Sequence, residues 1–150
     1  MFNFLRKRLE RRFDLPAITA AIEEAERKTS AEIRVSVSPF FWGSVNDVAA
    51  GAFHHLGMDQ TAERNGVLIF VVPSRRQFVI FGDVGIHAKA GQELWDRAAA
   101  RIGAKFRAKD FTGGLLDGIA EISAALAEHF PPKGDADKDE LPNEVHFHHH

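Results

Sequence analysis

The sequence contains no cysteine, and this absence removes several kinds of chemistry at once. Disulfide bonds, thiolate nucleophiles and zinc sites built on cysteine are excluded. No apolar run approaches the roughly 18 residues that span a bilayer, and the first eight residues lack the apolar stretch of a signal peptide. We therefore expect a soluble protein whose default location is the cytoplasm.

A strong charge of either sign is also missing. The chain has 19 Lys and Arg residues against 21 Asp and Glu residues, which gives a net charge of −2. Such a balance provides no overall attraction to nucleic acid. Apolar residues make up 45% of the 150 residues, so the composition predicts one ordinary globular domain.

Several hydrolase signatures are absent as well. The sequence has no Gly-x-Ser-x-Gly element of a serine hydrolase and no glycine-rich phosphate loop that ends in Lys-Ser/Thr. No Asp-x-Asp pair follows an apolar strand, because Asp135 and Asp137 lie in an acidic C-terminal stretch. The sequence motifs alone therefore do not indicate which reaction, if any, the protein catalyses.

Residues 1–13 form the first segment of interest. Their apolar positions recur every three or four residues among five basic ones, which predicts a basic amphipathic helix. Such a helix can lie on a membrane surface or bind an acidic partner, and it can equally pack on the domain with its charges in water.

The pattern of residues 14–132 predicts helices that alternate with strands. Strands are expected at 32–38, 66–72 and 77–81, and long helices at 14–29, 44–56, 93–107 and 115–129. The first strand alternates and should be half buried, whereas the second carries no polar side chain and should be covered on both faces. Residues 133–150 read as an acidic tail that ends in histidines, either native or the remnant of a tag.

The predicted architecture is an α/β fold. The first two strands flank a helix and should be parallel, and the short turn at Pro73 makes the third antiparallel. Helices on both faces then give a three-layer α/β/α sandwich around a mostly parallel mixed sheet. This arrangement brings Glu32, Asp83 and the pair Arg64 and Asn65 to one edge, with Asp96 nearby.

Three segments of the chain resemble the TPM domain family, named after a thylakoid lumen protein, a photosystem II protein and a nematode membrane protein. The segments are Thr29-Ser30-Ala31-Glu32-Ile33-Arg34-Val35, Arg64-Asn65-Gly66-Val67-Leu68-Ile69 and Gly82-Asp83-Val84-Gly85-Ile86. Trp95, Asp110-Phe111-Thr112-Gly113-Gly114-Leu115 and Asp139-Glu140-Leu141-Pro142-Asn143-Glu144 also resemble its small bacterial members. The order and spacing of these segments carry the likeness, which spans roughly residues 14 to 145.

The resemblance implies an α/β/α sandwich, a phosphatase label and the binding of calcium or magnesium. Many family members carry a signal peptide and a transmembrane segment, and this chain departs from them in showing neither pattern. Roles in photosynthesis or membrane repair therefore do not transfer, and the shared fold alone does not establish catalysis.

The predicted metal ligands are Glu32, Asp83 and Asp96, whose carboxylate oxygens suit a hard cation. Asn65 could add a carbonyl oxygen, Arg64 could hold a phosphate, and His87 is the histidine to watch as a general acid or base. A purely structural interpretation stays open, in which Asp83 caps a turn, Glu32 pairs with Arg64 and Asp96 lies in water.

The sequence thus leaves three functions open. The first is a cation-binding interaction or accessory module with an unidentified protein partner, and the second is a metal-assisted phosphomonoester hydrolase. The third is a peripheral membrane adaptor that uses residues 1–13.

Overall fold

The computed structural model describes residue 7 and residues 11–39, 43–132 and 145–147. Most of the predicted N-terminal helix, all of the acidic stretch 133–144 and the terminal histidines 148–150 lie outside the described residues. None of the helices within these ranges has the length and apolarity needed to cross a membrane.

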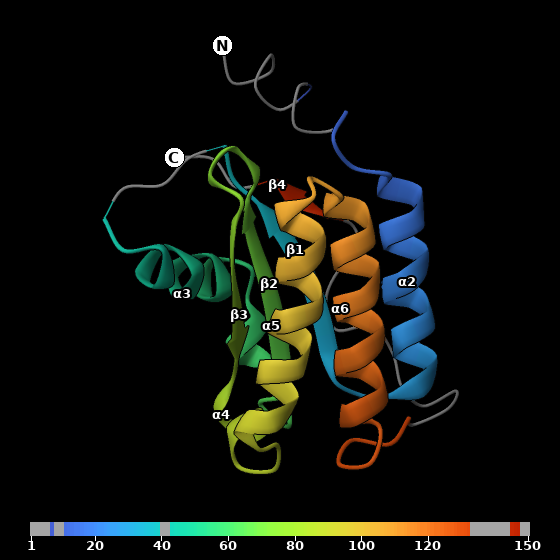
Figure 1. Cartoon of the computed structure of the whole chain (residues 1–150). Coiled ribbons are helices and arrows are strands. Elements are labelled where there is room, and N and C mark those ends of the chain that lie inside the picture. The colour runs from blue at the N-terminus through green and yellow to red at the C-terminus, as the bar shows by residue number, and fades with distance from the viewer. Residues whose placement is uncertain (1–6, 8–10, 40–42, 133–144, 148–150) are drawn as a thin grey trace.

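The described chain alternates helices and strands (Figure 1). The elements run in this order: α2 (Leu15–Lys28), β1 (Glu32–Val37), α3 (Val45–His55), η1 (Met58–Gln60), β2 (Gly66–Val72), η2 (Pro73–Arg75), β3 (Gln77–Gly82), α4 (Val84–His87), α5 (Gln92–Arg107), α6 (Phe111–Leu126) and β4 (His146–Phe147). Asp14 begins α2 as predicted, because its Oδ1 accepts a 3.1 Å hydrogen bond from the Ala17 amide.

The strands form one mixed sheet in the order β3-β2-β1-β4. Strands β1 and β2 are parallel, and β3 returns antiparallel to β2, as the sequence predicts. Strand β4 pairs in parallel with the end of β1, so two residues of the predicted tail belong to the sheet. Helix α5 packs closely on α6, and α6 on α2.

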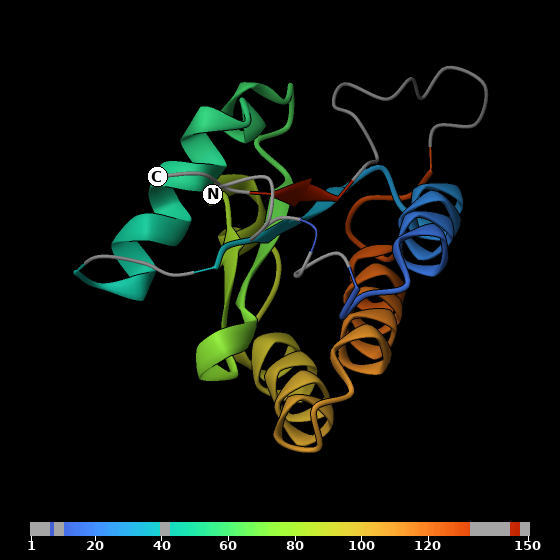
Figure 2. The ribbon, with the colours of Figure 1, turned by 90° about the horizontal axis from the view of Figure 1, so that it is seen from above.

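Helices cover both faces of this sheet, which confirms the three-layer α/β fold. Seen from above, α2, α5 and α6 lie on one side and α3 on the other (Figure 2). The side chains of Val67, Ile69 and Val71 pack into the core under the three helices. The intervening Leu68 and Phe70 pack against α3.

Strand β1 is buried on both faces, so the expectation of a half-buried strand is wrong. Its polar residues Glu32, Arg34 and Ser36 are at most 4% exposed. They are tolerated there because they have polar partners: Arg34 binds Glu32 at 2.8 Å, and Ser36 Oγ lies 3.0 Å from Nδ1 of His146.

Helix α6 begins four residues earlier than the sequence suggested. The sequence predicts a helix that begins at residue 115, after a break at Asp110-Phe111-Thr112-Gly113-Gly114, yet Asp110 caps the helix by accepting a 2.9 Å hydrogen bond from the Gly113 amide. Gly114 is required by packing instead, because a Cβ there would lie 2.8 Å from the Phe106 ring on α5. The glycines therefore mark a close helix contact.

Two short elements also differ from expectation. The sequence also predicts a short helical turn at residues 61–64, but the structure has this turn at Met58–Gln60, after Gly57 takes the left-handed conformation with φ 73°. A four-residue helix, α4, follows β3 directly, with Asp83 as its N-cap. This helix fixes the position of the Asp83 carboxylate.

Candidate functional site

The predicted acidic residues Glu32 and Asp83 lie at the same edge of the sheet. Glu32 is in register with Gly66 at the start of β2, and its amide donates to the Asn65 carbonyl at 3.1 Å. The Asp83 amide donates to the Gly66 carbonyl at 3.0 Å. The edge formed by residues 64–66, Glu32 and Asp83 is called the acidic edge below.

Asp83 and Arg64 form the central contact of the acidic edge. The Arg64 Nε and Nη2 groups donate to the two Asp83 oxygens at 2.6 and 2.9 Å. The side chain of Asp83 is 5% exposed and that of Arg64 is 48% exposed. The Asp83 Oδ1 atom also accepts from the Val84 amide at 2.8 Å, so one carboxylate serves both the ion pair and the cap of α4.

Electrostatics reinforce this pair. The hydrogen bonds that Arg64 donates to Asp83 raise the pKa of Arg64 above its ordinary value, although partial burial opposes the shift. The negative charges of Asp83 and of Asp59 on η1 raise this pKa further. Arg64 therefore stays a cation at every pH at which the protein is folded.

Backbone contacts hold Arg64 in place. Its φ of 52° is in the left-handed region, and its carbonyl accepts a 2.9 Å hydrogen bond from the Gly85 amide. A Cβ on Gly85 would collide with the carbonyl oxygen of Glu63 and would lie 2.6 Å from that of Arg64. The first turn of α4 thus packs directly on the loop that presents the guanidinium.

Glu32 does not join this pair. Its Oε2 atom accepts from Arg34 Nη2 at 2.8 Å, and the same nitrogen lies 3.4 Å from Glu26 Oε1 on α2. Arg34 also donates to the Ile33 carbonyl at 2.6 Å. Glu32 therefore pairs with an arginine of its own strand and not with Arg64, the partner that the structural interpretation of the sequence suggested.

Asn65 connects two segments of the acidic edge. Its Nδ2 group donates to the Ser30 carbonyl at 3.2 Å, and its amide donates to Thr61 Oγ1 at 3.1 Å. With its carbonyl bound to the Glu32 amide, Asn65 ties the start of β1 to the loop before β2.

The side chains of Asp96 and His87 contact residues other than Arg64 and Asp83. Asp96 is exposed on α5, and its Oδ1 atom accepts from Gln92 Nε2 at 3.1 Å. His87 is exposed at the end of α4, with its ring centroid 6.1 Å from that of Trp95. The His87 amide donates to the Asp83 carbonyl at 3.2 Å within α4, but neither the His87 nor the Asp96 side chain hydrogen-bonds to the Asp83 carboxylate.

Among the described residues, no three carboxylate or histidine side chains come together as a group able to hold a metal ion. The side chains of Glu32, Asp83 and Asp96 each have a different partner in the structure. Calcium takes six to eight oxygen ligands, which can include backbone carbonyls and waters as well as carboxylates. Magnesium keeps several waters and needs only one or two carboxylates, and Asp83 is the residue here that could supply one.

The neighbouring residue Asp59 gives a pH prediction. The Gln60 side chain, followed by the hydrogen bond with His54, lowers the pKa of Asp59 from its ordinary value of 3.8. Because the pKa is depressed by folding, the stabilising contribution of Asp59 is present above pH 3.8 and is lost as the pH falls through the folded-state pKa. Carboxyl NMR should give a midpoint below 3.8 that rises in Gln60→Ala and is unchanged in Gln92→Ala. A midpoint of 3.8 or higher in the wild type would contradict this assignment.

A cavity lies at the opposite edge of the sheet, beyond the carboxyl ends of β1 and β2. It measures about 520 Å³ and is lined by Arg12, Pro73, Ser74, Arg76, Lys109 and Phe111. The sequence did not lead to a predicted site at this edge, because the predicted site was chosen from the positions of carboxylate residues. The available signal was the rule that ligands of open α/β sheets bind outside the carboxyl ends of parallel strands, together with the basic turn at Arg75 and Arg76.

With this geometry in place, comparison with known proteins identifies the class of domain. The sequence profile of the TPM domain matches residues 12–125. The chain belongs to the TPM domain family, as the resemblance of its motifs suggested. No curated protein matches the chain.

Solved structures agree with this assignment. The NMR structure of the BA42 protein from the psychrophilic bacterium Bizionia argentinensis is 41% identical, with a TM-score of 0.84, and the match covers 89% of this chain and 92% of that one. The N-terminal domain of a P. gingivalis protein has 16% identity and a TM-score of 0.62 over 87% of this chain and 76% of that one. The N-terminal domain of the cg2496 protein from Corynebacterium glutamicum has 19% identity and a TM-score of 0.57, covering 90% and 80%. These last two likenesses concern the fold.

Proposed function

We propose that this TPM domain is a binding module that takes a divalent cation, of the magnesium type, at Asp83. The proposal rests on one observation. The Asp83 side chain is only 5% exposed, and its partner, the Arg64 side chain, is 48% exposed. The half-exposed Arg64 guanidinium has room to move into solvent, whereas Asp83 stays fixed by the amide of Val84. The incoming cation then replaces the charge that the buried carboxylate loses. The carboxylate is therefore preorganised for a cation that competes with the guanidinium.

This exchange suits an accessory or interaction module. When a divalent cation replaces Arg64 at Asp83, the guanidinium becomes free in solvent and the acidic edge gains two positive charges. A protein partner with an acidic surface would bind the two forms differently. The coupling between cation and partner would then be the function of the domain.

Titration with Mg²⁺ and with Ca²⁺, followed by amide NMR, tests the site. We expect saturable shifts at residues 83–85, with both ions weak because one carboxylate and water supply most of the ligands. Asp83→Asn should abolish the shifts while keeping the cap of α4, since asparagine caps as well as aspartate. Glu23→Gln, which removes an exposed carboxylate on α2, should change nothing.

Arg64→Gly provides the decisive variant. Glycine adopts the φ of 52° without strain, and the change removes the competing cation. We expect Mg²⁺ to bind about tenfold more tightly, the factor that corresponds to 1.4 kcal/mol. Equal affinity in the wild type and Arg64→Gly, or shifts that survive Asp83→Asn, would overturn the proposal.

The alternative function, metal-assisted phosphomonoester hydrolysis, rests on the same pair, because the half-exposed Arg64 could hold a phosphate next to Asp83. The binding proposal is favoured because hydrolysis also needs a second group to activate the attacking water, and Glu32, the other predicted carboxylate at this edge, is engaged with Arg34. Hydrolysis of p-nitrophenyl phosphate with Mg²⁺ separates the two. Turnover in the wild type that disappears in Asp83→Asn would establish the hydrolase instead.

A further inference from the structure

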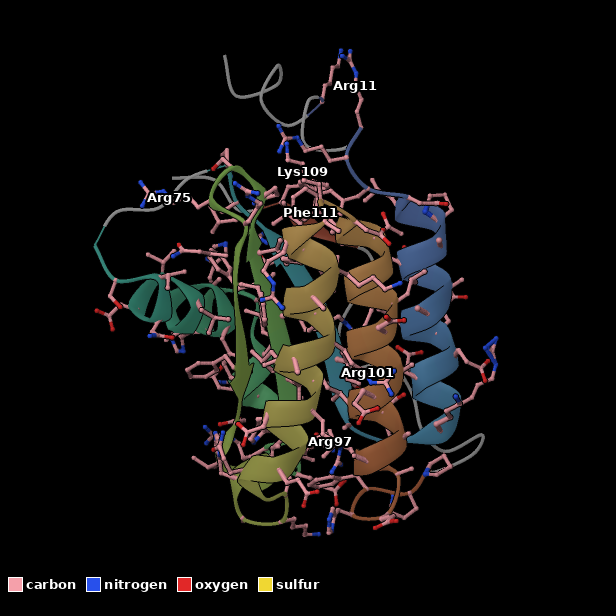
Figure 3. The ribbon with its side chains drawn as sticks, in the orientation of Figure 1. Arg11, Arg75, Arg97, Arg101, Lys109 and Phe111 are labelled. Atoms are coloured by element: carbon pink, nitrogen blue, oxygen red, sulfur yellow. The ribbon has the colours of Figure 1, made fainter. Side chains whose placement is uncertain are left out.

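The cavity at the carboxyl ends of the parallel strands, called the basic pocket below, is built by three separate segments. Arg12 precedes α2, Ser74 and Arg76 belong to the turn between β2 and β3, and Lys109 precedes α6. Figure 3 labels Lys109 and Phe111 at this end of the molecule, where Arg11 and Arg75 also lie. The sequence separates these segments widely, and only the fold brings them together.

The charge of the basic pocket departs from that of the chain as a whole. The molecule carries a net charge of −2, yet the six lining residues include three cations and no carboxylate. Within the part of the chain that the structure describes, Arg12, Arg76 and Lys109 form no ion pair with a carboxylate. Helices α2 and α6 begin at this edge, and their N-terminal ends are capped by the carboxylates of Asp14 and Asp110, which do not line the pocket.

Two of these cations occupy backbone positions that favour glycine. Arg76 has φ 50° and Lys109 has φ 64°, both in the left-handed region. Lys109 follows the last residues of α5, where glycine is the usual residue for ending a helix. A basic side chain at each of these positions adds charge to the pocket at the expense of backbone strain.

The apolar residues that line the basic pocket, called its floor below, are buried. Phe111 is 5% exposed, with its ring centroid 5.1 Å from that of Phe106 and 6.0 Å from that of Phe13. Pro73 is also buried. The volume of about 520 Å³ lies within the range typical of small-molecule sites and exceeds the size of a bare phosphate. A cationic rim above an apolar floor suits a ligand with an anionic head and an organic body.

We propose that the basic pocket binds a small organic phosphate, with the phosphate on Arg12, Arg76 and Lys109 and the organic group against Phe111 and Pro73. A phosphomonoester carries close to two negative charges at neutral pH, which matches a site of several unpaired cations better than a carboxylate does. This site is separate from the acidic edge, and it does not depend on the cation proposed there.

Amide NMR of the full chain, without added divalent cation, tests the proposal with three probes. Phenyl phosphate should give saturable shifts at residues 74–76 and 109–111. Inorganic phosphate, which lacks the ring, and benzenesulfonate, which carries one charge, should each bind about tenfold more weakly. Equal affinity for phenyl phosphate and benzenesulfonate would overturn the preference for phosphate, and equal affinity for inorganic phosphate would overturn the role of the apolar floor.

Variants separate a binding role from a structural one. Arg76→Gly and Lys109→Gly should each weaken phenyl phosphate about tenfold, the effect of losing one charge-assisted hydrogen bond. Their thermal midpoints should be unchanged or higher, because glycine adopts a positive φ without strain. Arg12→Gln should weaken binding in the same way.

Arg101→Gln is the matched control. It removes one positive charge from α5. Arg101 does not line the pocket, and its Nε atom lies 3.5 Å from Oε2 of Glu121. Arg101→Gln and Asp83→Asn should leave phenyl phosphate binding unchanged. The proposal fails if phenyl phosphate produces no saturable shift, or if Arg101→Gln weakens it as much as Lys109→Gly does.

Discussion

Replacing Gly85 with alanine should lower the free energy of unfolding by about 2–4 kcal/mol, a cost expected when a methyl group is forced against fixed backbone. The new Cβ would collide with the Glu63 carbonyl and lie 2.6 Å from the Arg64 oxygen. Backbone atoms cannot turn aside as a side chain can, so α4 must move. That movement also weakens the 2.9 Å hydrogen bond from the Gly85 amide to the Arg64 carbonyl.

Urea denaturation measures this effect as a lower midpoint with an unchanged slope. Gly51→Ala is the matched control, because a Cβ at Gly51 meets no atom within 4 Å on the exposed side of α3. Alanine there should raise stability by about 0.5–1 kcal/mol through helix propensity. Wild-type stability in Gly85→Ala would show that the loop at Glu63 and Arg64 yields easily and that it does not fix the guanidinium.

The position of the acidic edge could be predicted because it depends on backbone pairing alone. The seven apolar residues from Gly66 to Val72 form the central strand, and the turn at Pro73 forces β3 to return beside it. Asp83 at the end of β3 therefore lies next to Gly66. Runs of hydrophobic residues and short turns carry this information locally.

The side-chain partners at this edge could not be predicted with the same success. Glu32 and Arg34 are two residues apart in a strand, so they lie on the same face and pair with each other. Arg64 pairs with Asp83 from a left-handed backbone conformation. This conformation is unusual for arginine and could not be predicted from the sequence. From the sequence alone, either arginine, Arg34 or Arg64, could pair with either carboxylate. The structure shows which pairs form.

The start of α6 shows a different limit. Consecutive glycines usually interrupt a helix, and the predicted helix therefore begins only at residue 115, after Gly113 and Gly114. In the structure, Gly114 and Gly118 lie under α5, where a Cβ would come within 2.8 Å of Phe106 and 2.5 Å of Ile102 respectively. Tertiary packing overrides the local propensity, and the sequence of one helix alone does not reveal it.

Phe106→Ala should have the largest effect on stability, with a loss of about 3–5 kcal/mol against a total of about 5–15 kcal/mol for a domain. The ring is 1% exposed and makes edge contacts with Phe78 and Phe111, at centroid distances of 5.3 and 5.1 Å. Gly114 faces it from α6 with no side chain to fill the space. The cavity therefore persists, and the full cost of the lost contacts remains.

Chemical denaturation of Phe106→Ala should be compared with Phe106→Leu and Phe78→Ala. Leucine keeps most of the volume, so Phe106→Leu should cost much less than alanine. Phe78 is only partly buried, so its truncation should also cost less. Because Phe106 supports Phe111, Phe106→Ala should weaken phenyl phosphate binding under conditions where the variant is still folded. A loss below 1 kcal/mol would mean that α5 and α6 move together to close the cavity, and that the floor of the basic pocket is not rigid.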